Sequence, residues 1–302
     1  MTQPAPPFDF ARNAYPLAPH TFYRIGGPAA WALFPENPEQ ARAAYAWARE
    51  HEAPLLVMGA GSNLLIDDRG FDGVVLFTTE IKHIEDLGDH RFRVGAGLPL
   101  ADVVRTLMLP NNYAGVGALT GIPGTVGGAL FMNAGTVNGT ICQMTETVTL
   151  LRPDGIETVL MTPELYSYRG QRFCSPEDAI VAATLAFTPS TNDEAAVYRR
   201  YIQRRQDTQP QGWCCGSVFK NPPNDHAGRL IEACGLKGKR LGGAVISDKH
   251  ANFIMNEDNA TFDDVMGLIR LVKETVQERF GVSLQEEVRI ISPGYGPAQI
   301  PA

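Results

Sequence analysis

The chain has 302 residues, of which 44% are hydrophobic and 20% charged, and its 26 Lys and Arg against 33 Asp and Glu leave a net charge of −7. This apolar content excludes a disordered chain, and the length suggests about two domains. Generic nucleic-acid binding is not expected, because no run of basic residues could neutralise a line of phosphates. The sequence also contains neither an apolar run near the roughly 20 residues of a membrane helix nor a recognisable secretory signal.

The cysteines and histidines exclude two further classes of protein. Five cysteines form an odd set without a CxxC pair, and two of them, Cys214 and Cys215, are adjacent. Neighbouring cysteines make a strained disulfide, so we expect free thiols and a cytoplasmic location. The six histidines are scattered, and no His/Cys/Asp cluster has the spacing of a metal site.

The first half of the chain reads as strands and helices in alternation after an irregular proline-rich lead-in over residues 1–20. Asn37 followed by Pro38 and Glu39 is typical of a helix start, and this helix is expected to run to about Glu50. A second helix is expected over 99–109, where Pro110 stops it. Buried strands are predicted at 54–59, 64–66, 73–77 and 91–97, separated by Gly and Asp turns.

The second half begins after a glycine-dense stretch at 115–135. A hairpin turning at Pro153 and a buried strand over 179–187 follow, and the polar stretch 188–196 is the predicted domain boundary. Beyond it we expect helices at 196–206, 227–235 and 261–281 and a final strand at 286–291. The predicted division is an N-terminal arm (1–20), a first domain (21–190) and a smaller, more helical domain (191–302).

The segment Gly59-Ala60-Gly61-Ser62-Asn63-Leu64 resembles a dinucleotide fingerprint only superficially. It lacks the third glycine, and the residues after it read as strand and turn rather than helix, which disfavours a Rossmann fold. A tight loop between strands whose bare N–H groups form an anion-binding concavity fits better, with Ser62 and Asn63 as further donors. A plain turn remains the alternative.

A second glycine loop spans residues 121–128, and six glycines lie between 115 and 128. Such density is entropically costly and implies positive-φ positions or a close approach to a ligand. Two glycine loops in one domain suit a dinucleotide with two phosphates and a large planar head. A loop shaped by packing alone remains possible for this segment.

Several polar residues stand out beyond the loops, each with an ordinary structural alternative. Ser217 follows Gly216, but the positions around it lack the glycines of a nucleophile elbow. Taken alone, Ser217 is therefore interpreted as a turn or capping hydroxyl. Lys220 and Asn221 could hold a phosphate or a carbonyl. Arg169 lies among tyrosines, where surface stacking is common, and Glu287 reads as part of a strand with a cross-strand salt pair as the default.

Taken together, six segments resemble, in order, the UDP-N-acetylenolpyruvoylglucosamine reductase (MurB) family over roughly residues 20–291. They are TFYRIGGPAAWALFP, VMGAGSNLLIDDRGFDGVVL, GIPGTVGGALFMNAG, GSVFKNP, AGRLIEACGLKGKRLGGAVISDKHANFIMN and LQEEVRII. The resemblance implies an α+β protein, with a vanillyl-alcohol-oxidase (PCMH-type) FAD-binding domain and then a smaller α+β substrate-binding domain. It also implies non-covalent FAD, NADPH as a transient reductant, and reduction of the enolpyruvyl ether of the UDP-sugar to UDP-N-acetylmuramate for peptidoglycan.

The resemblance carries roles over to individual positions. It implies three catalytic residues: Arg169 as the arginine that stabilises charge, Ser217 as the proton donor and Glu287 as the glutamate that assists it. It implies contacts to the UDP-sugar from Tyr168, Lys220 and Asn221. The expected FAD contacts are Gly59, Ala60, Gly61, Ser62, Asn63, Leu64, Gly121, Ile122, Pro123, Gly124, Thr125, Gly127 and Gly128.

The chain departs from the family pattern in places that concern detail around the site. His20 stands where Asn is usual, Gln171 where the family has Ser, and Cys215 where a small residue such as Ala is usual. About 48 residues separate Arg169 from Ser217, which resembles the shorter subclass of the family. We expect small-molecule ligands only, with no nucleic acid, membrane insertion or obligate protein partner. A same-fold flavin oxidase of a small sugar or alcohol and a non-catalytic flavin- or nucleotide-binding module are the rival interpretations.

Overall fold

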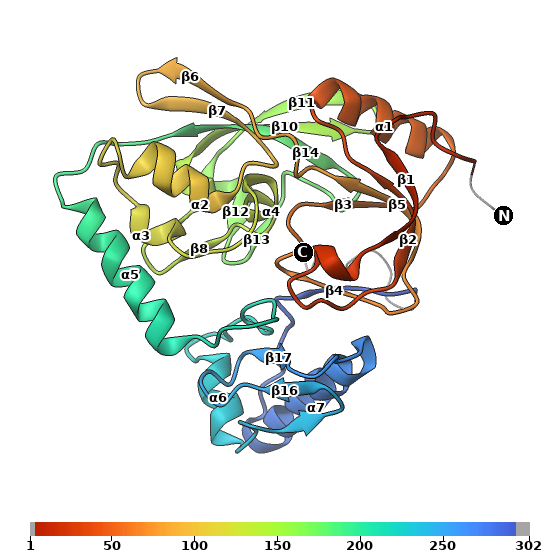
Figure 1. The fold of residues 1–302 in the computed structure, drawn as a ribbon. Coiled ribbons are helices and arrows are strands. Elements are labelled where there is room, and N and C mark those ends of the chain that lie inside the picture. The colour runs from red at the N-terminus through yellow and green to blue at the C-terminus, as the bar shows by residue number, and fades with distance from the viewer. Residues whose placement is uncertain (1–3, 294–302) are drawn as a thin grey trace. The chain divides into compact units, whose positions relative to one another are not determined.

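The structure is a computed structural model that describes residues 4–293, and the chain divides into two compact units, each assembled from separate segments. Unit 1 contains residues 4–15, 30–60 and 72–205. Unit 2 contains residues 16–29, 61–71 and 206–293. The chain therefore enters unit 2 twice before residue 72 and completes it only after residue 205 (Figure 1).

Unit 1 contains a four-stranded sheet and a helix that packs against it. The sheet has the order β1-β2-β5-β3, and β3 and β5 run parallel. Its strands are β1 (Ala11–Pro16), β2 (Pro28–Leu33), β3 (Leu55–Met58) and β5 (Phe71–Phe77). Helix α1 (Pro38–Glu50) buries Ala41, Ala44 and Ala48 in one cluster with Val74 and Leu76 of β5.

A second sheet of unit 1 is antiparallel, with the order β11-β10-β14-β7-β6. Its strands are β6 (Ile84–Gly88), β7 (Arg91–Gly95), β10 (Thr145–Arg152), β11 (Gly155–Leu160) and β14 (Ala179–Ala186). Short helices cover its buried face: α2 (Leu100–Asp102), continued by a π-helical segment (Val103–Met108), α3 (Val116–Leu119) and α4 (Val126–Phe131). Together they enclose an apolar cluster around Val148 and Leu150.

The smaller elements of unit 1 lie beside these helices, as Figure 1 shows for β8, β12, β13 and α4. They are β8 (Gly135–Thr136) with β9 (Gly139–Thr140), β12 (Tyr166–Ser167) with β13 (Gly170–Gln171), the single turns η3 (Ile141–Met144) and η4 (Pro163–Leu165), and helix α5 (Glu194–Thr208). Each strand pair is a tight hairpin.

Unit 2 is built around helix α7 (Phe262–Phe280), whose apolar stripe includes Val265, Ile269, Val272 and Val276. The other elements are η1 (Ala18–His20), β4 (Leu64–Ile66), α6 (Ala227–Ala233), β15 (Arg240–Leu241), β16 (Ala244–Ile246), β17 (Ile254–Asn256) and β18 (Arg289–Ile291). Strand β4 pairs in parallel with β18, and β15-β16-β17 form a separate sheet that packs on α7.

The structure confirms most of the expected elements and corrects three. Residues 11–16 form strand β1, so the expectation of irregular chain there was wrong. The glycine-dense stretch includes two short helices, and residues 126–128 belong to the second of them. Strand β18 begins at Arg289, so Glu287 precedes the strand rather than lying on it. The linear division at residue 190 stays a prediction about functional domains.

Candidate active site

The two predicted glycine loops meet inside unit 1. A Cβ atom at Gly59 would lie 2.4 Å from the Oγ1 of Thr125, so only glycine fits there without a shift. Thr125 is the N-cap of α4, and its hydroxyl accepts a hydrogen bond from the Gly128 N–H at 3.4 Å. The end of β3 and the start of α4 are therefore packed against each other through Thr125.

The backbone of the second loop explains its glycines. Gly121 and Gly124 have φ values of +72° and +114°, a region that residues with a Cβ avoid. Gly121 and Pro123 are exposed, and Ile122 is half-buried against the apolar cluster of unit 1. Gly127 is buried, and a Cβ there would lie 2.9 Å from the Ala96 Cβ, so this glycine serves helix packing.

Arg169 occupies the turn of the β12-β13 hairpin together with Tyr168. Its φ of +51° is unusual for a residue with a side chain, so the hairpin holds a mildly strained backbone. The Arg169 guanidinium lies 5.3 Å from the centre of the Tyr168 ring, and Tyr168 is 56% exposed. The buried Asn133 side chain donates from Nδ2 to the Ser167 carbonyl at 2.7 Å, which joins this hairpin to the segment that follows α4.

A second arginine, which sequence reasoning did not single out, lies beside the same loop. A Cβ at Gly121 would lie 2.5 Å from the Cδ of Arg205, which belongs to α5. Burial, and then the positive charge of Arg169, lower the pKa of the Arg205 guanidinium. Arg205 beside the exposed Gly121, with Arg169 close enough for its charge to act on Arg205, makes this part of unit 1 suited to an anionic ligand. The one sequence signal was the basic character of the 196–206 helix.

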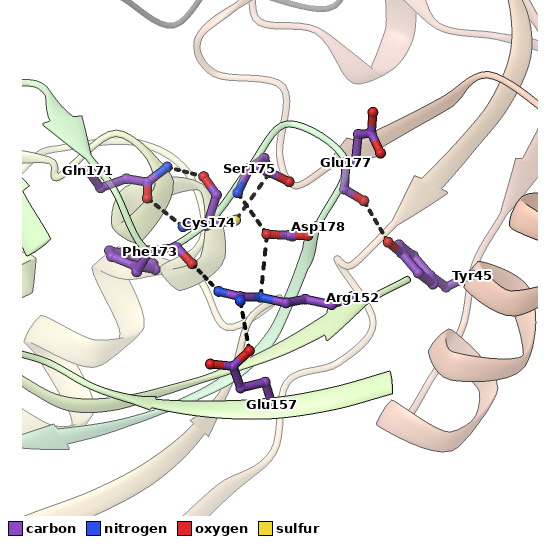
Figure 2. Close-up of polar contacts among 9 residues, drawn as sticks. All are labelled: Tyr45, Arg152, Glu157, Gln171, Phe173, Cys174, Ser175, Glu177 and Asp178. Carbon is purple, nitrogen blue, oxygen red and sulfur yellow. Dashed lines mark hydrogen bonds and ion pairs between the residues drawn. The ribbon is translucent and has the colours of Figure 1, made fainter. Parts of the chain in front are cut away.

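The chain after Arg169 is anchored by a polar network (Figure 2). Gln171 accepts from the Cys174 N–H at 2.8 Å and donates to the Cys174 carbonyl at 2.7 Å. Arg152 of β10 donates to the Phe173 carbonyl at 2.7 Å and lies 3.7 Å from the Asp178 carboxylate. The loop that returns from the Arg169 hairpin is thereby fixed to the five-stranded sheet.

The remaining predicted residues gather in unit 2. Ser217 follows Gly216, whose φ is +75°, and both are half-buried. The Val218 carbonyl accepts from the Glu287 N–H at 2.7 Å, so the main chain connects the segment after Ser217 directly to Glu287. Asn63 donates from Nδ2 to the Glu287 carbonyl at 2.9 Å. One residue of the first glycine loop is therefore a direct neighbour of the predicted catalytic glutamate.

Other residues near Ser217 have structural partners. The Lys220 N–H donates to the Gln285 carbonyl at 2.9 Å, and the Asn221 side chain accepts from the Ala227 N–H at 3.1 Å at the start of α6. The Cys215 thiol donates to the Leu64 carbonyl at 3.2 Å, and burial raises the pKa of this thiol well above its ordinary value. Cys215 is therefore unsuited to act as a nucleophile.

The predicted site residues thus belong to two groups. Unit 1 contains Arg169 and Tyr168 with Gly59, Ala60 and the loop 121–128. Unit 2 contains Ser217, Lys220, Asn221 and Glu287 with the remainder of the first loop, Gly61, Ser62, Asn63 and Leu64. Glu286, next to Glu287, forms its ion pair with Lys273 of α7 at 2.7 Å rather than across a strand.

Other site types find no support in the described part of the chain. Among residues 4–293, no group of three or more His, Cys, Asp or Glu side chains could hold a metal ion. Within the same range, the helices are too short or too polar to cross a membrane. All five cysteines are free thiols, as the sequence predicts.

Comparison with known proteins identifies the family. Residues 29–160 match the model of the FAD binding domain, and residues 208–291 match that of the UDP-N-acetylenolpyruvoylglucosamine reductase C-terminal domain. A UDP-N-acetylenolpyruvoylglucosamine reductase of Chlamydia felis is 38% identical over 94% of this chain and 95% of its own length. The chain belongs to the UDP-N-acetylenolpyruvoylglucosamine reductase family.

Two further relatives agree. The enzyme of the same name from a Synechococcus species is 39% identical over 91% of this chain and 89% of its own. The crystal structure of the enzyme from Thermus caldophilus superposes with a TM-score of 0.78 at 33% identity, covering 93% of this chain and 98% of that one. These matches confirm the predicted α+β fold with an FAD-binding domain, and the protein is a flavoprotein oxidoreductase.

The residues present fit FAD. A Cβ at Gly128 would meet only the Thr125 Oγ1, at 3.6 Å, so open space lies over this exposed backbone. Gly121 is exposed as well, and the nearby Arg169 and Arg205 supply positive charge. An open glycine backbone with cations beside it is what a pyrophosphate-containing cofactor requires. In unit 2, Asn63 and Leu64 continue the first loop toward Glu287.

Proposed function

We propose that the protein uses NADPH to reduce the enolpyruvyl ether of UDP-N-acetylenolpyruvoylglucosamine to UDP-N-acetylmuramate, in the cytoplasm, for peptidoglycan synthesis. The observation that carries the proposal is the main-chain connection between the Ser217 segment and Glu287, with Asn63 hydrogen-bonded to Glu287. The backbone next to Ser217, the backbone of Glu287 and Asn63 of the predicted cofactor loop are thus joined by hydrogen bonds within unit 2. Family membership supplies the substrate.

The reaction adds a hydride to C3 and a proton to C2 of the enolpyruvyl group. The two glycine loops, 59–64 and 121–128, would hold FAD, which when bound would supply the hydride at the expense of NADPH. Negative charge then develops at C2 and spreads into the substrate carboxylate. The guanidinium of Arg169 holds that carboxylate, which stabilises the charge.

Ser217 donates the proton from its hydroxyl to C2, and Glu287 orients and polarises this hydroxyl. Such general acid catalysis contributes about 10²–10⁴-fold to the rate. Gly216 at φ +75° makes the turn that presents Ser217. Tyr168, Lys220 and Asn221 contribute contacts to the UDP-sugar. The charges that bind anionic ligands are local ones, because the chain as a whole has a net charge of −7.

The decisive experiment is anaerobic stopped-flow spectroscopy of the purified holoenzyme. NADPH is expected to bleach the flavin, and UDP-N-acetylenolpyruvoylglucosamine is expected to restore its absorbance. Reoxidation by oxygen without a response to this substrate would refute the proposal in favour of a flavin oxidase. A flavin that NADPH does not bleach would favour a non-catalytic module.

Two variants with matched controls assign the catalytic residues. Ser217→Ala is expected to keep flavin reduction by NADPH and to lose about 100-fold or more in the reoxidation step. Ser283→Ala, an exposed serine of the same unit, is the control and should keep both steps. Equal loss of both steps in Ser217→Ala would assign Ser217 to cofactor binding instead.

Arg169→Lys is expected to lose substrate-dependent reoxidation, because an ammonium cannot reproduce the planar fork of a guanidinium on a carboxylate. Arg172→Lys is the control, since Arg172 is exposed and its side chain donates to the Glu164 carbonyl. A wild-type rate in Arg169→Lys would contradict its role in holding the carboxylate.

A further inference from the structure

One asparagine of unit 2 holds the segment that carries Ser217. Asn252 is only 3% exposed, and its Oδ1 accepts from the Phe219 N–H at 3.0 Å while its Nδ2 donates to the Phe219 carbonyl at 2.8 Å. The Asn252 carbonyl accepts from the Val218 N–H at 2.8 Å. A single residue thus satisfies three of the four backbone polar groups of Val218 and Phe219, directly after Ser217.

The opposite edge of the same segment is held by Glu287 and its neighbours. The Val218 carbonyl accepts from the Glu287 N–H at 2.7 Å and from the Val288 N–H at 3.3 Å. Phe219 also forms an isolated antiparallel bridge with Glu286. The backbone after Ser217 is therefore clamped from two sides, by Asn252 on one and by the segment of Glu287 on the other.

The chemistry of the clamp requires an asparagine. Its amide presents a donor and an acceptor side by side at the spacing of a peptide group, whereas aspartate lacks the donor and alanine lacks both. Phe219 is 1% exposed, so its backbone groups are shielded from bulk water in the folded protein. An unsatisfied buried N–H or C=O costs about 1–3 kcal/mol, which a shift of the segment would relieve.

We propose that Asn252 is a positioning residue for proton delivery, which sets the distance between the Ser217 hydroxyl and the Glu287 carboxylate without touching substrate. This inference rests on the proposed function, because it assigns to Asn252 the alignment of the two groups that serve the protonation of C2. A displacement of about 1 Å at a reacting group lowers a rate by roughly 100-fold. Loss of the clamp is therefore expected to act on the protonation step rather than on ligand binding.

Asn256 offers a matched control. It is also buried, at 8% exposure, and its side chain also makes two hydrogen bonds to backbone groups of unit 2. Its Nδ2 donates to the Tyr23 carbonyl at 2.8 Å and its Oδ1 accepts from the Ala260 N–H at 2.8 Å. Replacing either asparagine by alanine removes the same chemical groups. Only the Asn252 side chain bonds to the backbone after Ser217, whereas Asn256 contacts the chain before Ser217 through its own main chain, at Trp213.

The experiment compares both half-reactions in the wild-type holoenzyme, Asn252→Ala, Asn252→Asp and Asn256→Ala. In both Asn252 variants, reoxidation of reduced flavin by UDP-N-acetylenolpyruvoylglucosamine should fall about 100-fold at saturating substrate. Flavin reduction by NADPH and the KM for the UDP-sugar should stay near their wild-type values. The solvent deuterium isotope effect on reoxidation should rise, because proton transfer becomes slower. Asn256→Ala should lose thermal stability and keep the reoxidation rate.

Each alternative outcome is decisive. A wild-type reoxidation rate in folded Asn252→Ala or Asn252→Asp would overturn the inference alone, as would an equal loss in Asn256→Ala. The inference is also overturned if the rates of both half-reactions fall equally in the Asn252 variants, or if their solvent isotope effect on reoxidation is unchanged. Asn252→Asp keeps the acceptor for the Phe219 N–H, so it serves if the alanine variant does not fold. Wild-type protein that the UDP-sugar fails to reoxidise would refute the proposed function, and this inference with it.

Discussion

Replacing Gly128 by alanine separates cofactor binding from folding, because the two effects have opposite signs. Gly128 is the third residue of α4, and an added Cβ would meet only the Thr125 Oγ1, at an ordinary contact distance of 3.6 Å. Alanine in a helix is favoured over glycine by about 0.5–1 kcal/mol, so the apoprotein should become more stable by that amount.

The same methyl group would occupy the space over the exposed backbone that FAD is expected to use. Loss of one hydrogen bond from this backbone to a charged phosphate costs about 1.5–3 kcal/mol, which corresponds to a roughly 10- to 150-fold weaker Kd for FAD. Denaturant unfolding of the flavin-free protein measures the first effect, and titration of FAD fluorescence quenching measures the second.

Gly59→Ala provides the contrast. Its Cβ would lie 2.4 Å from the Thr125 Oγ1, so Thr125 must rotate and give up its cap on α4. Loss of a threonine cap costs about 1 kcal/mol, and this variant should therefore be less stable even without FAD. Unchanged FAD affinity in a stabilised Gly128→Ala would refute the reasoning, and so would a loss of both affinity and stability in that variant.

Three further predictions concern stability. Hydrogen bonds from Arg69 hold the pKa of Asp67 well below its usual range. Asp67→Asn should therefore lower the free energy of unfolding by about 2 kcal/mol at neutral pH, and this difference fades as the pH falls through the folded-state pKa. Equal neutral-pH stability of variant and wild type in a urea titration would contradict this. Burial lowers the pKa of His250 below 6.5, so the contribution of neutral His250 to stability is complete above about pH 6.5 and is lost as the pH falls toward the folded-state pKa. His250→Gln should therefore lose stability less steeply on acidification than the wild type. Identical slopes would exclude His250 as a cause of acid destabilisation. Arg152→Ala leaves the buried Asp178 carboxylate without its cation and should lower the free energy of unfolding by about 2 kcal/mol. Wild-type stability in Arg152→Lys would show that the planar fork of the guanidinium is unimportant here.

Features that depend on neighbouring residues were predictable from the sequence. Asn37 caps α1 by accepting from the Gln40 N–H at 2.9 Å, and Thr261 caps α7, which ends at Gly281 with a φ of +68°. These motifs are local, so their outcome depends little on the remainder of the fold. The glycine loops were predictable for the same reason, because positive φ and close approach are properties of the glycine itself, as at Gly121.

Features that depend on distant partners were not predictable. Asn252 and Phe219 are 33 residues apart, and nothing between them signals that an amide will pair with a backbone. Arg205 looked like one more charge on a basic helix until the fold placed Gly121 against its stem. Glu287 fitted the alternation of a strand, but its N–H pairs with Val218 and the ladder with β4 begins two residues later. Tertiary contacts decided each case.

The parallel pair of β4 and β18 has a consequence for the biosynthesis of the protein. It joins Leu64 to Arg289, so the ladder of β4 cannot form until residues made much later on the ribosome have been synthesised. The burial of Tyr23, Ile25 and Leu65 is delayed in the same way, because their apolar partners lie on α6 and α7. Contacts of such long sequence separation form slowly, and apolar segments exposed meanwhile favour aggregation. A nascent chain released before residue 289 would keep these side chains exposed to water. A prematurely terminated chain is therefore expected to bind chaperones.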